Sequence, residues 1–194
     1  TPDLAPLVSG YFPYTLRMPI NGEKPTVSLD SRLEGLALNL PAPFGKRAGE
    51  AVPLTLNIDQ ARERGEMVLR DRARMRWRTA PVGTQGQLWL ENWPLEPRWP
   101  RDPGWSVQWQ TNRLPISPWI DALSGLSLQH LSGRQGSGQG ADAGSLATIG
   151  LSTACLSLNN RCLGTLQANA DSLGGGNWQM ALDGSIAKGE VDYR

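Results

Sequence analysis

Apolar and polar residues alternate at every second position along most of the chain. The clearest stretch is RDRARMRWR, residues 70–78, where arginine takes every second position and Met75 and Trp77 lie between the arginines. Successive side chains of a strand point to opposite faces of a sheet, so a period of two predicts a strand. Because the apolar frame continues backwards through Met67 and Leu69, we predict one long strand with an arginine face and a largely apolar face.

The same alternation recurs throughout the chain and predicts a mainly β fold. It is found in TVSLDSRL, GLALNLP, PLTLNI, GQLWLE, WSVQWQ, GLSLQHL, CLSL, LGTLQANA and WQMALDG. In residues 26–41 the apolar frame shifts from odd to even positions at Gly35, which predicts a bulge that bends one long strand. We therefore expect a long, twisted, curved antiparallel sheet.

One segment carries the signals of a helix. In SPWIDALSG, residues 117–125, Ser117 is a suitable N-cap, Pro118 takes the first helical position and Gly125 ends the pattern. We predict one short helix at residues 117–124.

Segments rich in proline or glycine mark loops at residues 40–50, 92–105 and 132–145. The last of these is Gly-rich, and we predict that it is flexible. Residues 59–66 lie between two strand patterns and are interpreted as the end of a hairpin. Residues 1–194 are treated as a single β-rich segment. We expect it to be a piece of a longer polypeptide, because it starts without a methionine and stops within an alternating pattern.

Composition argues against metal, cofactor and catalytic chemistry. Lysine and arginine total 19 against 18 acidic residues, and this formal net charge of +1 lacks the global positive field of most nucleic-acid-binding proteins. His130 is the single histidine, which excludes a multi-histidine metal centre, and no Gly-x-Ser-x-Gly motif is present. We expect no cofactor, no metal site, no nucleic-acid partner and no enzymatic activity.

The arginine face has three interpretations. We favour a solvated exterior, with carboxylates of neighbouring strands such as Glu66 or Glu91 as partners. Contact with anionic lipid headgroups or with an envelope protein is the second interpretation, and contact with nucleic acid is the third.

Cys155 and Cys162 flank LSLNNR and are candidates for a cross-strand disulfide. With a two-residue loop at Asn159 and Asn160 the cysteines lie diagonally, whereas a four-residue loop that starts at Ser157 places them directly opposite. A disulfide would indicate an oxidising compartment. The alternative is a pair of half-buried free thiols in a cytosolic protein.

Eight tryptophans are unusual for a chain of this length. Trp93, Trp99 and Trp105 fall in the proline-rich loops, where their rings could stack on sugars or bases. We favour the simpler interpretation, in which they clamp irregular loops onto the sheet.

The apolar faces of so many strands need a partner. One short helix cannot cover them, so they must either meet each other in a sandwich or line a concave surface. Both architectures agree with the alternation.

Two phrases of the chain resemble the YhdP family of AsmA-like proteins. The first is SRLEGLALNLPAPFGKRAGEAVPL, residues 31–54, in which the matching positions are Ser31, Leu33, Gly35, Leu40, Pro41, Pro43, Lys46, Pro53 and Leu54. The second covers residues 163–193, with Leu163-Gly164, Trp178 and Lys188-Gly189-Glu190-Val191-x-Tyr193 in place. The two phrases bracket most of the chain, and the first is the more specific.

The resemblance implies a piece of a large envelope protein that is anchored in the inner membrane by a transmembrane helix outside this segment. It further implies a periplasmic β structure with an open, U-shaped hydrophobic groove that carries phospholipids between the inner and outer membranes and supports the outer-membrane permeability barrier. The rest of the same polypeptide and other envelope proteins would be its partners. The candidates for contact with acyl chains are Leu54, Leu56, Ile58, Met75, Trp77, Val107 and Trp109.

A second hypothesis is a closed β-sandwich that serves as a binding or structural module of the envelope. It would bind a glycan or a protein through Trp93, Trp99 and Trp105. The two hypotheses differ in whether protein or ligand covers the apolar faces.

Overall fold

The computed structural model describes residues 7–19, 25–81, 83–124 and 146–193. The Gly-rich segment at 132–145 and His130 lie outside these ranges. The strands are β1 (Val8–Gly10), β2 (Tyr14–Arg17), β3 (Thr26–Ser31), β4 (Leu36–Leu38), β5 (Leu54–Asp59), β6 (Arg64–Leu69), β7 (Ala73–Ala80), β8 (Gly83–Leu90), β9 (Gly104–Thr111), β10 (Leu114–Pro115), β11 (Leu146–Leu158), β12 (Arg161–Gly174), β13 (Asn177–Gly184) and β14 (Gly189–Tyr193), and the helix is α1 (Ile116–Ser124).

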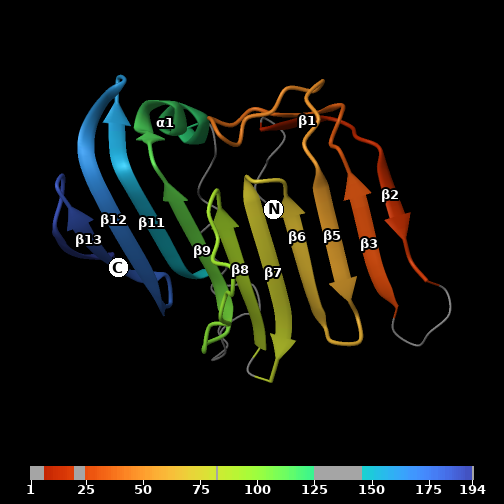
Figure 1. The fold of residues 1–194 in the computed structure, drawn as a ribbon. Helices are drawn as coiled ribbons and strands as arrows, with labels where there is room; N and C mark the ends of the chain where they lie inside the picture. Colours follow the sequence, from red (N-terminus) through yellow and green to blue (C-terminus); the bar gives the residue numbers. More distant parts are fainter. Residues whose placement is uncertain (1–6, 20–24, 82, 125–145, 194) are drawn as a thin grey trace.

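Nearly all of the strands belong to one open sheet. Its order is β14-β13-β12-β11-β9-β8-β7-β6-β5-β3-β2, with β10 beside β11. Figure 1 shows the sheet as a single twisted layer, with α1 and β1 along its upper edge. The first and last strands of this order do not pair with each other, so the sheet is not closed. The predicted mainly β fold with one short helix is confirmed.

Most strand pairs are antiparallel, as expected, but the pairs around β9 are not. Strand β9 runs parallel to both β8 and β11, and β10 also runs parallel to β11. Parallel neighbours need a long crossover, because a tight turn can only reverse the chain. Residues 91–103 supply one crossover, and the chain between β9 and β11, which contains α1, supplies the other.

The stretch of alternating arginines is a hairpin and not one strand. Strand β6 ends at Leu69, residues 70–72 form the turn, and β7 begins at Ala73. Arg70 has a positive φ of 46°, which the turn requires. Leu69 still pairs with Ala73 across the hairpin, so the apolar side chains of both strands share one face. A three-residue turn preserves the alternation, and the pattern therefore could not reveal it.

The predicted bulge at Gly35 is also wrong. The chain leaves the large sheet after Ser31, turns, and forms β4, which pairs with β1 in a separate two-stranded sheet. Gly35 has a φ of 98°, and a Cβ there would lie 2.2 Å from the backbone oxygen of Tyr11. Glycine is needed for this turn and close approach. By contrast, the hairpin end predicted at 59–66 is confirmed, since β5 ends and β6 begins within it.

The register of the large sheet aligns one apolar side chain from every strand of its main path. We call this line the apolar row: Leu16, Leu29, Leu56, Met67, Met75, Leu88, Val107, Ile149, Ala170, Met180 and Val191. Paired residues of neighbouring strands point to the same face. The apolar row therefore marks one apolar face of the sheet. The residues directly before and after each member along its own strand point to the opposite, polar face.

Two tryptophans fill gaps in the apolar face left by glycines. Trp77 pairs with Gly65, and Trp105 pairs with Gly86. A Cβ on Gly65 would lie 2.1 Å from the Trp77 ring, and one on Gly86 would lie 2.3 Å from the Trp105 ring. Each indole thus lies across the neighbouring strand, where any larger residue than glycine would displace it.

We predict that Gly65→Ala destabilises the protein by about 1–2 kcal/mol, because the new methyl group forces the Trp77 ring out of its place. Urea unfolding of the two proteins measures this difference. Gly49→Ala is the matched control, since nothing lies within 4 Å of a Cβ there, and its free energy of unfolding should stay within about 0.5 kcal/mol. Equal stability of the two variants would contradict this packing.

Candidate functional site

All of the predicted groove residues lie on the apolar face of the sheet. Leu56, Met75 and Val107 belong to the apolar row itself. The remaining four lie on the same face, each two residues along its strand from a member of the apolar row: Leu54, Ile58, Trp77 and Trp109. Each of the seven side chains is half-buried. Their contact with lipid remains a prediction.

The apolar face has little cover in the described part of the chain. Every strand of the large sheet lies in one layer, and the two-stranded sheet of β1 and β4 lies along its upper edge. Leu16 and Val191, at the two ends of the apolar row, are 53% and 51% exposed. The closed sandwich of the second hypothesis is therefore not the arrangement found here.

One end of the apolar face is covered by a cap, which consists of residues 32–53 and α1. Phe44 from the loop, Trp119 from α1 and Trp109 from β9 form an aromatic cluster with ring centroids 5.2–6.0 Å apart. Phe44 is buried, as are Leu33 and Val52. The cap buries these side chains at one end of the sheet, and in the described part of the chain the rest of the apolar face has little cover.

Residues of the first YhdP-like phrase build this cap. The Lys46 side chain is only 4% exposed, and its Nζ donates hydrogen bonds to the carbonyl oxygens of Leu36 at 2.6 Å and Arg47 at 3.0 Å. Ser31 Oγ donates to the carbonyl of Pro13 and accepts from the amide of Leu33. The phrase thus has a structural role that holds the loop in place over the strand ends.

The polar face carries the arginines of β7, and each has a partner. Arg74 forms an ion pair with Glu66 at 2.6 Å, as expected from the sequence. Arg76 donates to Gln87 Oε1 at 2.6–2.8 Å, and Arg78 Nε donates to Gln85 Oε1 at 2.8 Å. Burial lowers the pKa of the Arg76 guanidinium, and the positive charge of Arg74 adds to this effect.

The crossover between β8 and β9, residues 91–103, lies across these arginines. Trp99 in this crossover stacks with Arg76 and Arg78, whose Cζ atoms lie 4.0 and 4.6 Å from its ring centroid. Arg76 Nη2 also donates to the carbonyl of Pro97 at 2.7 Å. The arginine face is therefore partly covered by protein and is less solvated than we expected.

The three loop tryptophans do not form a shared platform. Trp99 clamps the crossover onto the polar face, as the favoured interpretation held. Trp105 is not a loop residue, because it lies in β9 on the opposite, apolar face. A glycan site that needs Trp93, Trp99 and Trp105 together therefore finds no support in this geometry.

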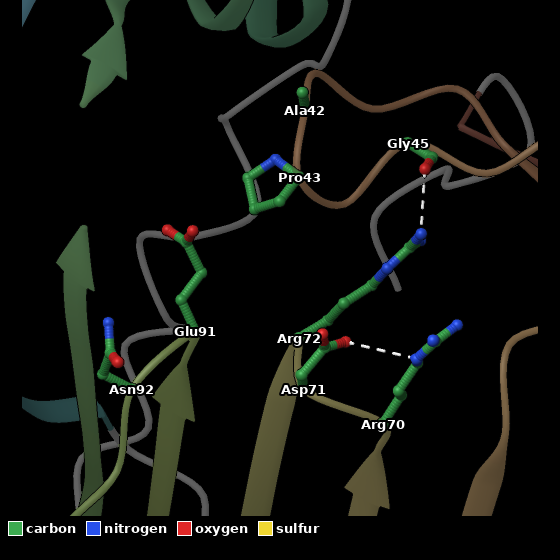
Figure 2. Close-up of a pocket in the computed structure, with 8 residues that line it drawn as sticks. All are labelled: Ala42, Pro43, Gly45, Arg70, Asp71, Arg72, Glu91 and Asn92. Atoms are coloured by element: carbon green, nitrogen blue, oxygen red, sulfur yellow. Dashed lines mark hydrogen bonds and ion pairs between the residues drawn. The ribbon is translucent and has the colours of Figure 1, made fainter. Parts of the chain in front are cut away.

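A polar cavity of about 690 Å³ lies at the rim of the sheet, between the cap and the strand ends. We call it the rim pocket. Figure 2 shows its lining: Ala42, Pro43 and Gly45 from the cap, Arg70, Asp71 and Arg72 from the β6–β7 turn, and Glu91 and Asn92 after β8. Sequence reasoning missed this pocket, because it assigned Arg70 and Arg72 to a strand.

A disulfide joins Cys155 and Cys162, whose Cα atoms lie 5.4 Å apart. The hairpin has the two-residue loop, with positive φ at both Asn159 and Asn160. A register shift between Thr153 and Ser157 accompanies it. Such an irregularity adds a residue to one strand and changes the pairing, which explains how cysteines that a regular ladder would leave diagonal come close enough to bond.

The described residues contain no group of three or more His, Cys, Asp or Glu side chains that could hold a metal ion. Within the same ranges, no helix is long and apolar enough to cross a membrane.

The family model described as YhdP protein matches residues 1–194, which is the whole chain. No curated protein and no solved structure matched. The resemblance inferred from the two phrases is confirmed, and it is consistent with a protein of the bacterial envelope.

We predict that Lys46→Met lowers the free energy of unfolding by about 1–3 kcal/mol, because it leaves two carbonyl oxygens of the cap without their donor. Lys188→Met removes the same charge from a side chain that is 83% exposed, so its effect should stay within about 0.5 kcal/mol. Denaturant unfolding of both variants provides the measurement. A loss that is equal in the two variants would show that the cap does not depend on Lys46.

Proposed function

The chain belongs to the YhdP protein family, and we propose that it is a non-enzymatic segment of a lipid conduit in the bacterial envelope. Acyl chains of phospholipids would lie against the apolar face and move along it between the inner and outer membranes, which would support the permeability barrier of the outer membrane. The observation that carries this proposal is the apolar row, which crosses all eleven strands of the main path without a polar residue.

The length of the apolar row fits a path better than a pocket. Neighbouring strands lie about 4.8 Å apart, so eleven strands carry the row across roughly 48 Å. A pocket for one small ligand is concave and encloses most of that ligand. A long, open and chemically uniform surface instead suits a ligand that is itself long and apolar, such as an acyl chain built of identical methylene groups.

The energetics favour lipid as the cover of this face. Each Å² of apolar surface removed from water contributes about 25 cal/mol. Exposed apolar patches of more than a few hundred Å² are rare in monomeric proteins and generally mark a binding surface. Tails that cover the half-buried side chains of the apolar face would gain this free energy without any residue-specific contact.

The mechanism is passive partition along a continuous wall. Tails would exchange one apolar neighbour for the next along the apolar row, while headgroups remain in water at the rim. No catalytic residue or cofactor is assigned, and the family is not known for enzymes. A periplasmic location agrees with the disulfide between Cys155 and Cys162, and an inner-membrane anchor would belong to the longer polypeptide.

The open edges of the sheet are suited to the rest of that polypeptide. Within the described residues β2 and β14 each have one paired neighbour and one free edge. Unpaired strand edges readily accept another strand. Preceding and following segments would extend the apolar row at both ends and give it the length that a path between two membranes needs.

We predict that Leu56→Glu and Trp77→Glu reduce the phospholipid bound to the purified chain by about tenfold, because each places a carboxylate among acyl chains. Native mass spectrometry of the protein with its co-purified lipid measures the loss. Asn57→Glu is the matched control: residue 57 neighbours Leu56 in β5 but points to the polar face, so lipid binding should be unchanged.

Circular dichroism of the variants separates loss of lipid from loss of fold. Folded Leu56→Glu and Trp77→Glu proteins that retain as much phospholipid as Asn57→Glu would refute the conduit. A lipid-free chain that binds a glycan would instead favour the envelope-module hypothesis.

A further inference from the structure

We propose that the rim pocket is a headgroup site for zwitterionic phospholipid, one that carries a phosphate and a primary ammonium group. This inference rests on the proposed function and adds a preference among lipids to it. It starts from the rim pocket residues Arg70, Arg72, Asp71 and Glu91, which bring two positive and two negative charges to one cavity.

Two of these opposite charges are neighbours that do not pair. The amide of Glu91 donates a backbone hydrogen bond to the carbonyl of Arg72 at 2.8 Å, so the two side chains start from adjacent strand ends. Residues of opposite charge in this position commonly form an ion pair. Here each side chain has another partner, and the two charged groups diverge (Figure 2).

The positive side of the rim pocket is fixed by the cap. Arg72 Nη2 forms an ion pair with Glu50 at 2.6 Å, and Nη1 donates to the carbonyl of Gly45 at 3.2 Å. Its side chain is only 16% exposed, whereas that of Arg70 is 57% exposed and, among the described residues, forms an ion pair with Asp71 at 3.7 Å. A guanidinium has five N–H donors, so both arginines keep donors for a phosphate.

The negative side is held by the aromatic cluster. Glu91 Oε2 accepts a hydrogen bond of 2.7 Å from Trp109 Nε1, and Glu91 has a positive φ of 65°, which turns the chain at this point. Figure 2 shows its carboxylate directed toward Pro43 at the cap. A carboxylate that accepts one hydrogen bond retains acceptor capacity for an ammonium group.

The four charged residues that line the rim pocket carry both signs and sum to zero, and Glu50 adds a negative charge beside Arg72 from outside the lining. A ligand with a phosphate near the arginines and an ammonium near Glu91 matches this arrangement. The rim pocket has a volume of about 690 Å³ and is open to solvent, so it could hold a headgroup while the rest of the lipid stays outside. The hydrogen bond from Trp109 links Glu91 to the end of the apolar face that the cap covers, so the tails of a lipid held here would run past the cap to the open part of that face.

The test compares dioleoyl phosphatidylethanolamine with dioleoyl phosphatidylglycerol, which share their tails and phosphate but differ in the ammonium group. We expect the purified chain to bind the ethanolamine lipid about fivefold more tightly. This is the largest gain in affinity that is typical of one partly exposed ion pair. Glu91→Gln should abolish this preference without weakening binding of the anionic glycerol lipid, because it removes a negative charge while glutamine can still accept the bond from Trp109.

Arg70→Gln should weaken the binding of both lipids by a similar factor, because both carry the phosphate. Glu96→Gln removes a carboxylate from an exposed position in the crossover, outside the rim pocket, and should retain the fivefold preference. Lipid binding is measured by native mass spectrometry after incubation with vesicles of each lipid.

Four outcomes would overturn the headgroup site. Equal binding of the two lipids by the unmodified chain would refute it and leave the conduit intact. The same preference in the Glu91→Gln variant would show that another part of the chain recognises the ammonium group. Free phosphoethanolamine that binds as tightly as the lipid would identify a site for a soluble metabolite. Binding of neither lipid would refute the conduit together with its headgroup site.

Discussion

The structure depends on the hydrogen-bonded register of its large sheet. Along the apolar row each pairing brings an apolar residue beside another, from Leu16 in β2 to Val191 in β14. A slip of one residue in any strand would turn its apolar side chains to the polar face. The two tryptophan and glycine pairs, Trp77 with Gly65 and Trp105 with Gly86, work against such a slip because each ring needs a glycine beside it.

A face of this kind would normally be buried by a second layer. In the described residues that layer is limited to the cap, where Phe44, Trp109 and Trp119 pack together and Lys46 holds the loop. The polar face is treated differently, because the crossover of residues 91–103 is fastened to it through Trp99 and Arg76. Protein covers much of the polar side near β7 and β8 and leaves most of the apolar side open, the reverse of a globular domain.

Parts of the candidate site were predictable from alternation alone. Leu54, Leu56 and Ile58 were assigned to one face, and so were Met75 and Trp77, because the period of a strand is independent of its neighbours. The rim pocket was not predictable. Its charged residues come from the β6–β7 turn and from the end of β8, and alternation across residues 70–72 hides that turn.

The sequence by itself determined the β character, the short helix, the apolar face of each strand and the family, since all of these follow from local periods, caps and motifs. Only the tertiary structure decided the parallel position of β9, the departure of the chain at Gly35 and the course of the crossover over the arginines. It also decided that the apolar faces form one open layer. The physical reason is that periodicity records which side of a strand avoids water, whereas the neighbour that covers this side is set by long-range pairing.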